Sequence, residues 1–167
     1  ITADLDRMDI SFAQPFLDDV FSDMDGKISG RIDVKGPVSN LKITSSDTRL
    51  DEGRLKVAYT NVPYNAEGTF HIDETGAYFD GISIRDDYTG TGMVEGSINW
   101  DHFRNMNFNT SISINEIEAI NIDEDHAESF YGRVFGTGNI TITGPVESLL
   151  MTVDAITAKP GQLHIPV

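Results

Sequence analysis

The chain has 167 residues, enough for one domain with a sizeable core. Its 12 lysines and arginines against 27 aspartates and glutamates give a formal charge of −15, which excludes a partner held mainly through phosphates, such as nucleic acid, and opposes docking on an anionic membrane surface. Binding of an uncharged acyl chain stays open, whereas the absence of cysteine excludes disulfides and thiolate metal sites.

The first predicted element is a short helix over residues 13–22. Pro15 suits a first helical position, and Asp18 and Asp19 suit the positive end of the helix dipole. One face of this helix would be apolar and would carry Phe16, Leu17, Val20 and Phe21. We expect the helix to serve as a plug or lid.

The rest of the chain is dominated by apolar residues at every second position, the period of a strand with one buried and one solvated face. In chain order this alternation covers 28–34, 55–59, 68–72, 82–84, 94–100, 108–114, 140–142 and 151–153. Turn sequences such as Gly36-Pro37 and Gly144-Pro145 separate the runs, and short gaps favour antiparallel hairpins. The sequence therefore predicts an all-β fold with an antiparallel-rich sheet of about ten strands.

Several glycines fall on the apolar face of the predicted strands: Gly30, Gly68, Gly96, Gly136 and Gly138. Such glycines favour a sheet that bends around its apolar face. The bent sheet either packs solid or leaves an apolar trough, and the pattern alone leaves both open. The candidate groove-lining residues are those on the apolar face, namely Ile28, Ile32, Val34, Leu55, Val57, Tyr59, Phe70, Ile72, Val94, Ile98, Phe108, Ile112, Ile114, Ile140, Ile142 and Val153.

Residues 30–41 and 138–149 resemble one another, with Gly, Ile, Gly, Pro, Val and Leu at matching positions. Two copies of a strand followed by a Gly-Pro turn and a second strand suggest a repetitive β architecture, with chance similarity between amphipathic hairpins as the alternative. We expect residues 1–167 to be a single β domain and part of a longer repetitive β protein.

Residue patterns that would support catalysis or metal binding are weak. The histidines His71, His102, His126 and His164 are scattered without metal-ligand spacing. Asp23-Met24-Asp25-Gly26 superficially resembles a calcium loop but lacks the later ligands, so we expect a solvated turn there. The acidic stretch 121–129 lacks a strand period and is predicted to be a loop or a brief turn of helix, which could attract a cation but is more typical of a hydrated surface. We assign no catalytic residue, no metal site and no cofactor, and we expect no buried charge along the strands.

The stretch 130–145, together with 161–167, resembles the C-terminal region of TamB-like proteins, particularly those of Bacteroidetes-type bacteria. The Gly-rich strand and Gly-Pro turn over 26–41, and residues 90–98, are similar to that family as well. This resemblance implies a long periplasmic protein, anchored in the inner membrane outside this segment, whose sheet curls into a taco-like half-pipe with an apolar interior. The family is linked to phospholipid movement between membranes and to outer-membrane protein assembly with a TamA-type β-barrel partner, and it has no catalytic residues to carry over.

Two functional hypotheses therefore remain. The first is a non-catalytic segment that binds phospholipid acyl chains in an apolar groove, supports outer-membrane protein assembly, or does both. The second is a closed β-sandwich module for adhesion or carbohydrate binding, which the same alternation and acidic loops permit. The dispersed aromatic residues disfavour the second hypothesis without excluding it.

Overall fold

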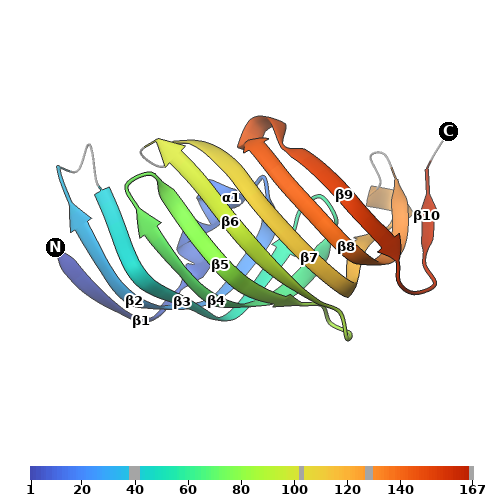
Figure 1. Ribbon diagram of the computed structural model, residues 1–167, viewed down its shortest axis with the longest axis horizontal. Helices are drawn as coiled ribbons and strands as arrows, with labels where there is room; N and C mark the ends of the chain where they lie inside the picture. The colour runs from blue at the N-terminus through green and yellow to red at the C-terminus, as the bar shows by residue number, and fades with distance from the viewer. Residues whose placement is uncertain (38–41, 102–103, 127–129, 166–167) are drawn as a thin grey trace.

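A computed structural model describes the chain except for residues 38–41, 102–103, 127–129 and 166–167. It contains one ten-stranded sheet in which every pair of neighbouring strands is antiparallel (Figure 1). The strands are β1 (Thr2–Asp9), β2 (Phe21–Lys35), β3 (Lys42–Val57), β4 (Val62–Asp73), β5 (Gly76–Arg85), β6 (Thr91–Asp101), β7 (Arg104–Ile122), β8 (Tyr131–Pro145), β9 (Leu150–Thr157) and β10 (Gln162–His164).

The strands lie side by side in chain order from β1 to β8, and β9 and β10 then share the outer edge of β8. Among the described residues β1 pairs with β2 alone, so the two edges of the sheet do not meet. Figure 1 shows the sheet curling about its long axis. The predicted all-β fold, a curved antiparallel sheet forming a half-pipe, is confirmed.

The sheet curls because its long strands bend at bulges and glycines. Every neighbouring pair from β1 to β8 contains at least one shift of register. Gly96 on β6 has a φ of 130°, and a Cβ there would overlap the backbone of Asn109 and Thr110 on β7. A residue with a side chain could neither adopt this backbone nor fit this contact.

Apolar side chains on one face of the sheet form the core, and we call this the inner face. Its buried members on β2, β3, β4, β5 and β7 pack together as one cluster: Met24, Ile28, Leu50, Ala66, Ile84, Ile114 and Ile117. Polar residues alternate with them on the opposite, outer face. The predicted alternation therefore defines the inside and outside of the half-pipe.

The predicted helix near the start is shorter and begins earlier than 13–22. A 3-10 turn, η1 (Ile10–Ala13), leads into α1 (Gln14–Leu17), and the Asp9 carboxylate caps the turn by accepting a 2.8 Å hydrogen bond from the Ser11 N–H. Helix cannot continue to residue 22 because Phe21 already pairs with Val57 as the first residue of β2. Buried Ile10, with Ala13 and Leu17, packs on the inner-face cluster.

The two similar segments have matching local structure where both are described. Gly36 and Gly144, which precede the two prolines, have φ values of 100° and 102°. The remainder of the first copy, residues 38–41, lies outside the described residues, whereas in the second copy η3 (Val146–Ser148) leads into β9.

Two local predictions have different outcomes. The solvated turn predicted for residues 23–26 is wrong, because these residues lie inside β2 and Met24 is buried in the core. Within the acidic stretch, residues 121–122 complete β7 and a single 3-10 turn follows, η2 (Glu124–His126). This agrees with the predicted turn of helix, and residues 127–129 lie outside the described part.

Candidate functional site: the inner face of the half-pipe

The strand register brings the predicted groove-lining residues into rows that run along the half-pipe. Ile82, Val94, Ile112, Ile140 and Val153 are successive cross-strand partners from β5 to β9. Because directly paired residues in an antiparallel ladder point to the same side, this row is a continuous apolar track across five strands. Ile82, which was not among the predicted groove-lining residues, completes this row at β5.

A second region of the inner face spans β2, β3 and β4. Ile28 pairs with Leu50, and Leu55 pairs with both Met24 and Tyr64. All the predicted lining residues except Tyr59 fall at inner-face positions of the described strands: Ile28, Ile32, Val34, Leu55, Val57, Phe70, Ile72, Val94, Ile98, Phe108, Ile112, Ile114, Ile140, Ile142 and Val153.

The assignment of Tyr59 to the groove is wrong. β3 ends at Val57, and Tyr59 lies in the following turn with 63% of its surface exposed. Its ring makes an edge-on contact with Phe130 at 5.7 Å between centroids. The alternation continued by chance for one step past the strand end, where Asn61 adopts a φ of 57° to complete the turn.

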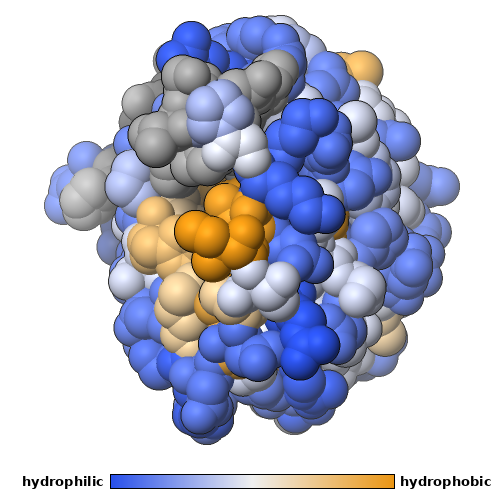
Figure 2. Space-filling model, turned by 90° about the vertical axis from the view of Figure 1, so that its left-hand side faces the viewer, coloured by the Kyte–Doolittle hydropathy of each residue, from blue (hydrophilic) through white to orange (hydrophobic). Residues whose placement is uncertain are grey.

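Accessibility changes along the inner face. In the middle of the sheet the lining residues pack on one another, so that Ile114 is only 7% exposed. At the β9 edge, Met151 and Val153 keep 42% and 57% of their surface exposed. Figure 2 shows the opposite end, where apolar surface gathers near the centre with hydrophilic residues below it and to its right. The apolar interior thus reaches solvent at both ends.

Buried charges interrupt the sheet on one side, contrary to the prediction that the strands carry none. The β5–β6 hairpin is short, so β4 and β7 meet beyond its tip without an intervening strand. The contact includes a 3.0 Å hydrogen bond from the Asn121 N–H to the Thr60 carbonyl and a 2.7 Å bond from the Tyr64 hydroxyl to the Glu118 carbonyl. We call this contact the β4–β7 seam.

The Asp86 carboxylate at the hairpin tip fastens the seam. It is 4% exposed and accepts hydrogen bonds of 2.8 to 2.9 Å from the backbone N–H groups of Tyr88, Gly90 and Glu118. Burial of a carboxylate is costly unless its oxygens are hydrogen-bonded, and here the backbone supplies the donors. Asp86 therefore joins the tip of the hairpin to β7.

Glu118 is the second buried carboxylate at the seam, with a side chain only 4% exposed. It accepts a 2.6 Å hydrogen bond from Arg133 Nε on β8, and the Arg133 guanidinium lies over the Tyr88 ring at 4.6 Å. The hydrogen bond to Glu118 is the main reason that the pKa of Arg133 is raised. Both carboxylates look like ordinary surface acids in the sequence, since the partners that hold them at the seam, the Glu118 N–H for Asp86 and Arg133 for Glu118, are 32 and 15 residues away along the chain.

Tyr64 should make the seam less stable as the pH rises into the alkaline range. Burial raises the pKa of its hydroxyl, and the Glu118 and Asp86 carboxylates raise it further. A raised folded-state pKa contributes stability below the unfolded value of about 10, and that contribution is lost as the pH rises above it.

We predict that the free energy of unfolding of Tyr64→Phe declines less steeply above about pH 10 than that of the unmodified chain. At neutral pH the variant should lose about 1 kcal/mol with the hydrogen bond to Glu118. Urea unfolding at a series of alkaline pH values measures both effects, and parallel pH profiles for the two proteins would contradict the assignment.

No group of three or more His, Asp or Glu side chains is arranged to hold a metal ion within the described ranges. None of the helical segments in the same ranges combines the length and the apolar character needed to cross a membrane.

No family model, curated protein or solved structure matches the chain.

Proposed function

We propose that this chain is a non-catalytic segment of a TamB-like envelope protein whose half-pipe accommodates phospholipid acyl chains in its apolar interior. The single observation that supports this most strongly is the row Ile82, Val94, Ile112, Ile140 and Val153, which provides apolar contact without interruption from β5 to β9. Its exposed end at Val153 is where an acyl chain has room to enter.

The energetics suit transport. Each methylene moved from water to an apolar surface gains about 0.8 kcal/mol, so an acyl chain of roughly 16 carbons gains on the order of 10 kcal/mol when fully covered. A track of similar aliphatic side chains offers no single position of preferred binding, which allows a chain to slide along it. The buried charges Asp86 and Glu118 lie at the seam and are neutralised by hydrogen bonds or by Arg133, so they do not break the track.

The wider setting follows from the resemblance and belongs to the same proposal: a periplasmic protein anchored in the inner membrane, moving phospholipid between membranes or assisting outer-membrane protein assembly with a TamA-type partner. The alternative of a β-sandwich module has less support, because the described residues form one open sheet and not two packed sheets.

Photo-crosslinking in the full-length protein tests the proposal. A benzophenone amino acid at Val153 on the inner face should capture phospholipid, whereas the same amino acid at the neighbouring Thr152, which points outward, should not. Mass spectrometry after irradiation in bacteria detects the adduct. Ile142 and Thr141 form a second inner and outer pair on β8. Equal capture at inner and outer positions, or no lipid adduct at any inner position, would overturn the proposal.

A further inference from the structure

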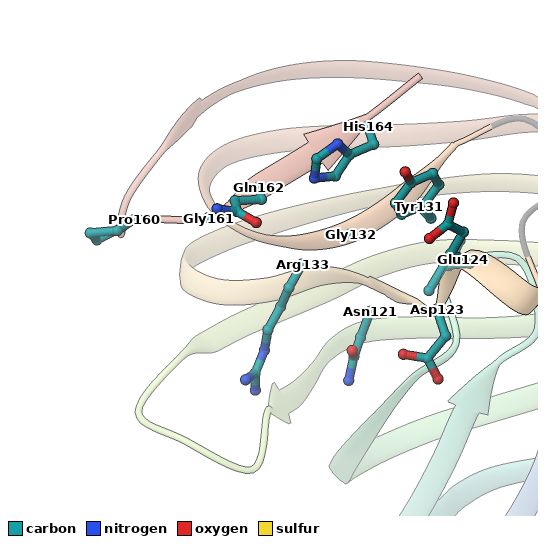
Figure 3. Close-up of a pocket in the computed structure, with 11 residues that line it drawn as sticks. Asn121, Asp123, Glu124, Tyr131, Gly132, Arg133, Pro160, Gly161, Gln162 and His164 are labelled. Atoms are coloured by element: carbon teal, nitrogen blue, oxygen red, sulfur yellow. The ribbon is translucent and has the colours of Figure 1, made fainter. Parts of the chain in front are cut away.

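A cavity of about 740 Å³ lies where β7 and β8 meet β10, and Figure 3 shows the residues around it. The pairing of β8 with β7 and β10 shows which face of the sheet each residue near this cavity occupies. Arg133 pairs with Asn121 and Gln162, and these polar residues share the outer face, whereas Gly132 pairs with Ile122 and Leu163 on the inner face. The polar side chains of the cavity therefore come from the outer face, and although Ile122 and Gly132 also line it, no residue of the apolar track does.

The cavity combines an aromatic stack with planar polar groups. The rings of Tyr131 and His164 stack at 4.8 Å between centroids and 9° between planes, and His164 is exposed. Asp123, Glu124 and Gln162 also line the cavity, and within the described residues their side chains make no hydrogen bond or ion pair. Arg133, by contrast, is committed to Glu118.

These groups match the chemistry of a sugar ring. A pyranose presents a C–H face that packs on an aromatic ring and a rim of hydroxyls that donate to carboxylates and exchange hydrogen bonds with amides. Carboxylate acceptors strengthen hydrogen bonds from neutral hydroxyls. An aromatic platform with a few convergent polar groups in a concavity is the general form of a small-molecule site.

The outer face beyond the cavity extends the argument from one sugar to a chain. Between residues 107 and 115 the outward residues of β7 are short, uncharged and exposed, and so are two of their neighbours on β8: Asn107, Asn109, Ser111, Ser113, Asn115, Asn139 and Thr141. We call this surface the polar ledge. On β2 and β3, in contrast, outward positions carry charges such as Arg31, Asp33 and Arg49. The ledge residues themselves carry no charge, although Glu95 on β6 and Asp154 on β9 border them opposite Ser111 and Asn139, and an uncharged surface of this kind suits a polymer that is itself neutral.

We propose that the cavity and the polar ledge together bind a neutral glycan chain, with one sugar ring against the Tyr131–His164 stack. The net charge of −15 and the unpaired Asp123 and Glu124 repel sulfated or uronic-acid glycans. The ligand class is thus an uncharged, hydroxyl-rich polysaccharide. No residue of the lipid track lines the cavity, so each proposal can fail independently.

Calorimetric titration of the chain with chitotetraose and with cellotetraose tests the proposal, and a heparin tetrasaccharide serves as the acidic comparison. We expect saturable binding of at least one neutral tetrasaccharide and none of heparin. His164→Ala should weaken that binding about tenfold or more by removing half of the stack. His164 is exposed on the short edge strand β10, so its removal should leave the fold intact, which thermal unfolding verifies.

The chain offers a matched control in a second stacked pair, His71 and Tyr78, with rings 4.9 Å apart and 11° between planes. This pair lies on β4 and β5, away from the cavity, so His71→Ala should bind the tetrasaccharide as the unmodified chain does. An equal loss in the two variants, tight binding of heparin, or no saturable binding of either neutral tetrasaccharide would overturn the proposal.

Discussion

Replacing Gly90 with alanine is expected to lower the free energy of unfolding by about 3 kcal/mol. A Cβ at this position would overlap the Asp86 carboxylate and the backbone of Ile117. Neither neighbour can retreat without breaking the hydrogen bond between Asp86 and the Glu118 N–H that fastens the β4–β7 seam. Thermal unfolding followed by circular dichroism should show a fall in Tm of about 6 to 12 °C.

Gly136→Ala is the matched control for Gly90→Ala. Gly136 also lies in the sheet, but the atoms nearest to a Cβ there would be the Ile114 Cδ1 at 3.6 Å and the Ile156 carbonyl oxygen at 3.7 Å, which are ordinary contacts. Its free energy of unfolding should therefore stay within about 0.5 kcal/mol of the unmodified chain. A similar loss in both variants would show that the strands, and not the seam, are sensitive to added side chains.

The inner face could be predicted from the sequence because it depends on local alternation. The track from Val94 to Val153 follows from period-two patterning, and antiparallel pairing then aligns apolar positions without further information. The same reasoning fails at strand ends, as at Tyr59, because alternation carries no signal for where pairing stops.

The sequence predicted that the strands bend, but it identified only some of the positions where they do. Glycines such as Gly30 and Gly96 marked some of them. Other bulges use residues that no turn pattern identifies, including Arg7 and Glu116, with φ values of 52° and 51° beside a shift of register. Their left-handed backbone is imposed by the neighbouring strands, so the local sequence does not reveal it.

The seam was missed because its chemistry depends on contacts between distant parts of the chain. Asp86 is 32 residues from Glu118, and Glu118 is 15 residues from Arg133. In an acidic chain each carboxylate is expected to be solvated. One signal was available in the sequence. Residues 86–90 come soon after the alternating run 82–84, which indicates a short β5–β6 hairpin, and this shortness lets β4 and β7 meet beyond the hairpin tip.

The second large effect is expected from Arg133→Met, which leaves the Glu118 carboxylate buried without its cationic partner. Removing one member of a buried pair costs about 3 to 5 kcal/mol, and the 43% exposure of the Arg133 side chain reduces this to about 2 kcal/mol because water can partly solvate the carboxylate. Urea unfolding of the two proteins at neutral pH measures the difference.

Two further variants separate the buried charge from simple loss of contact. Arg31→Met removes an ion pair with Asp4 whose side chains are 65% and 75% exposed, and it should leave the free energy of unfolding essentially unchanged. The double variant Arg133→Met with Glu118→Gln should recover part of the loss, because no unpaired charge then remains in the seam. If the double variant were no more stable than Arg133→Met alone, Arg133 would stabilise the seam through its packing on Tyr88 and Phe135 and not through its charge.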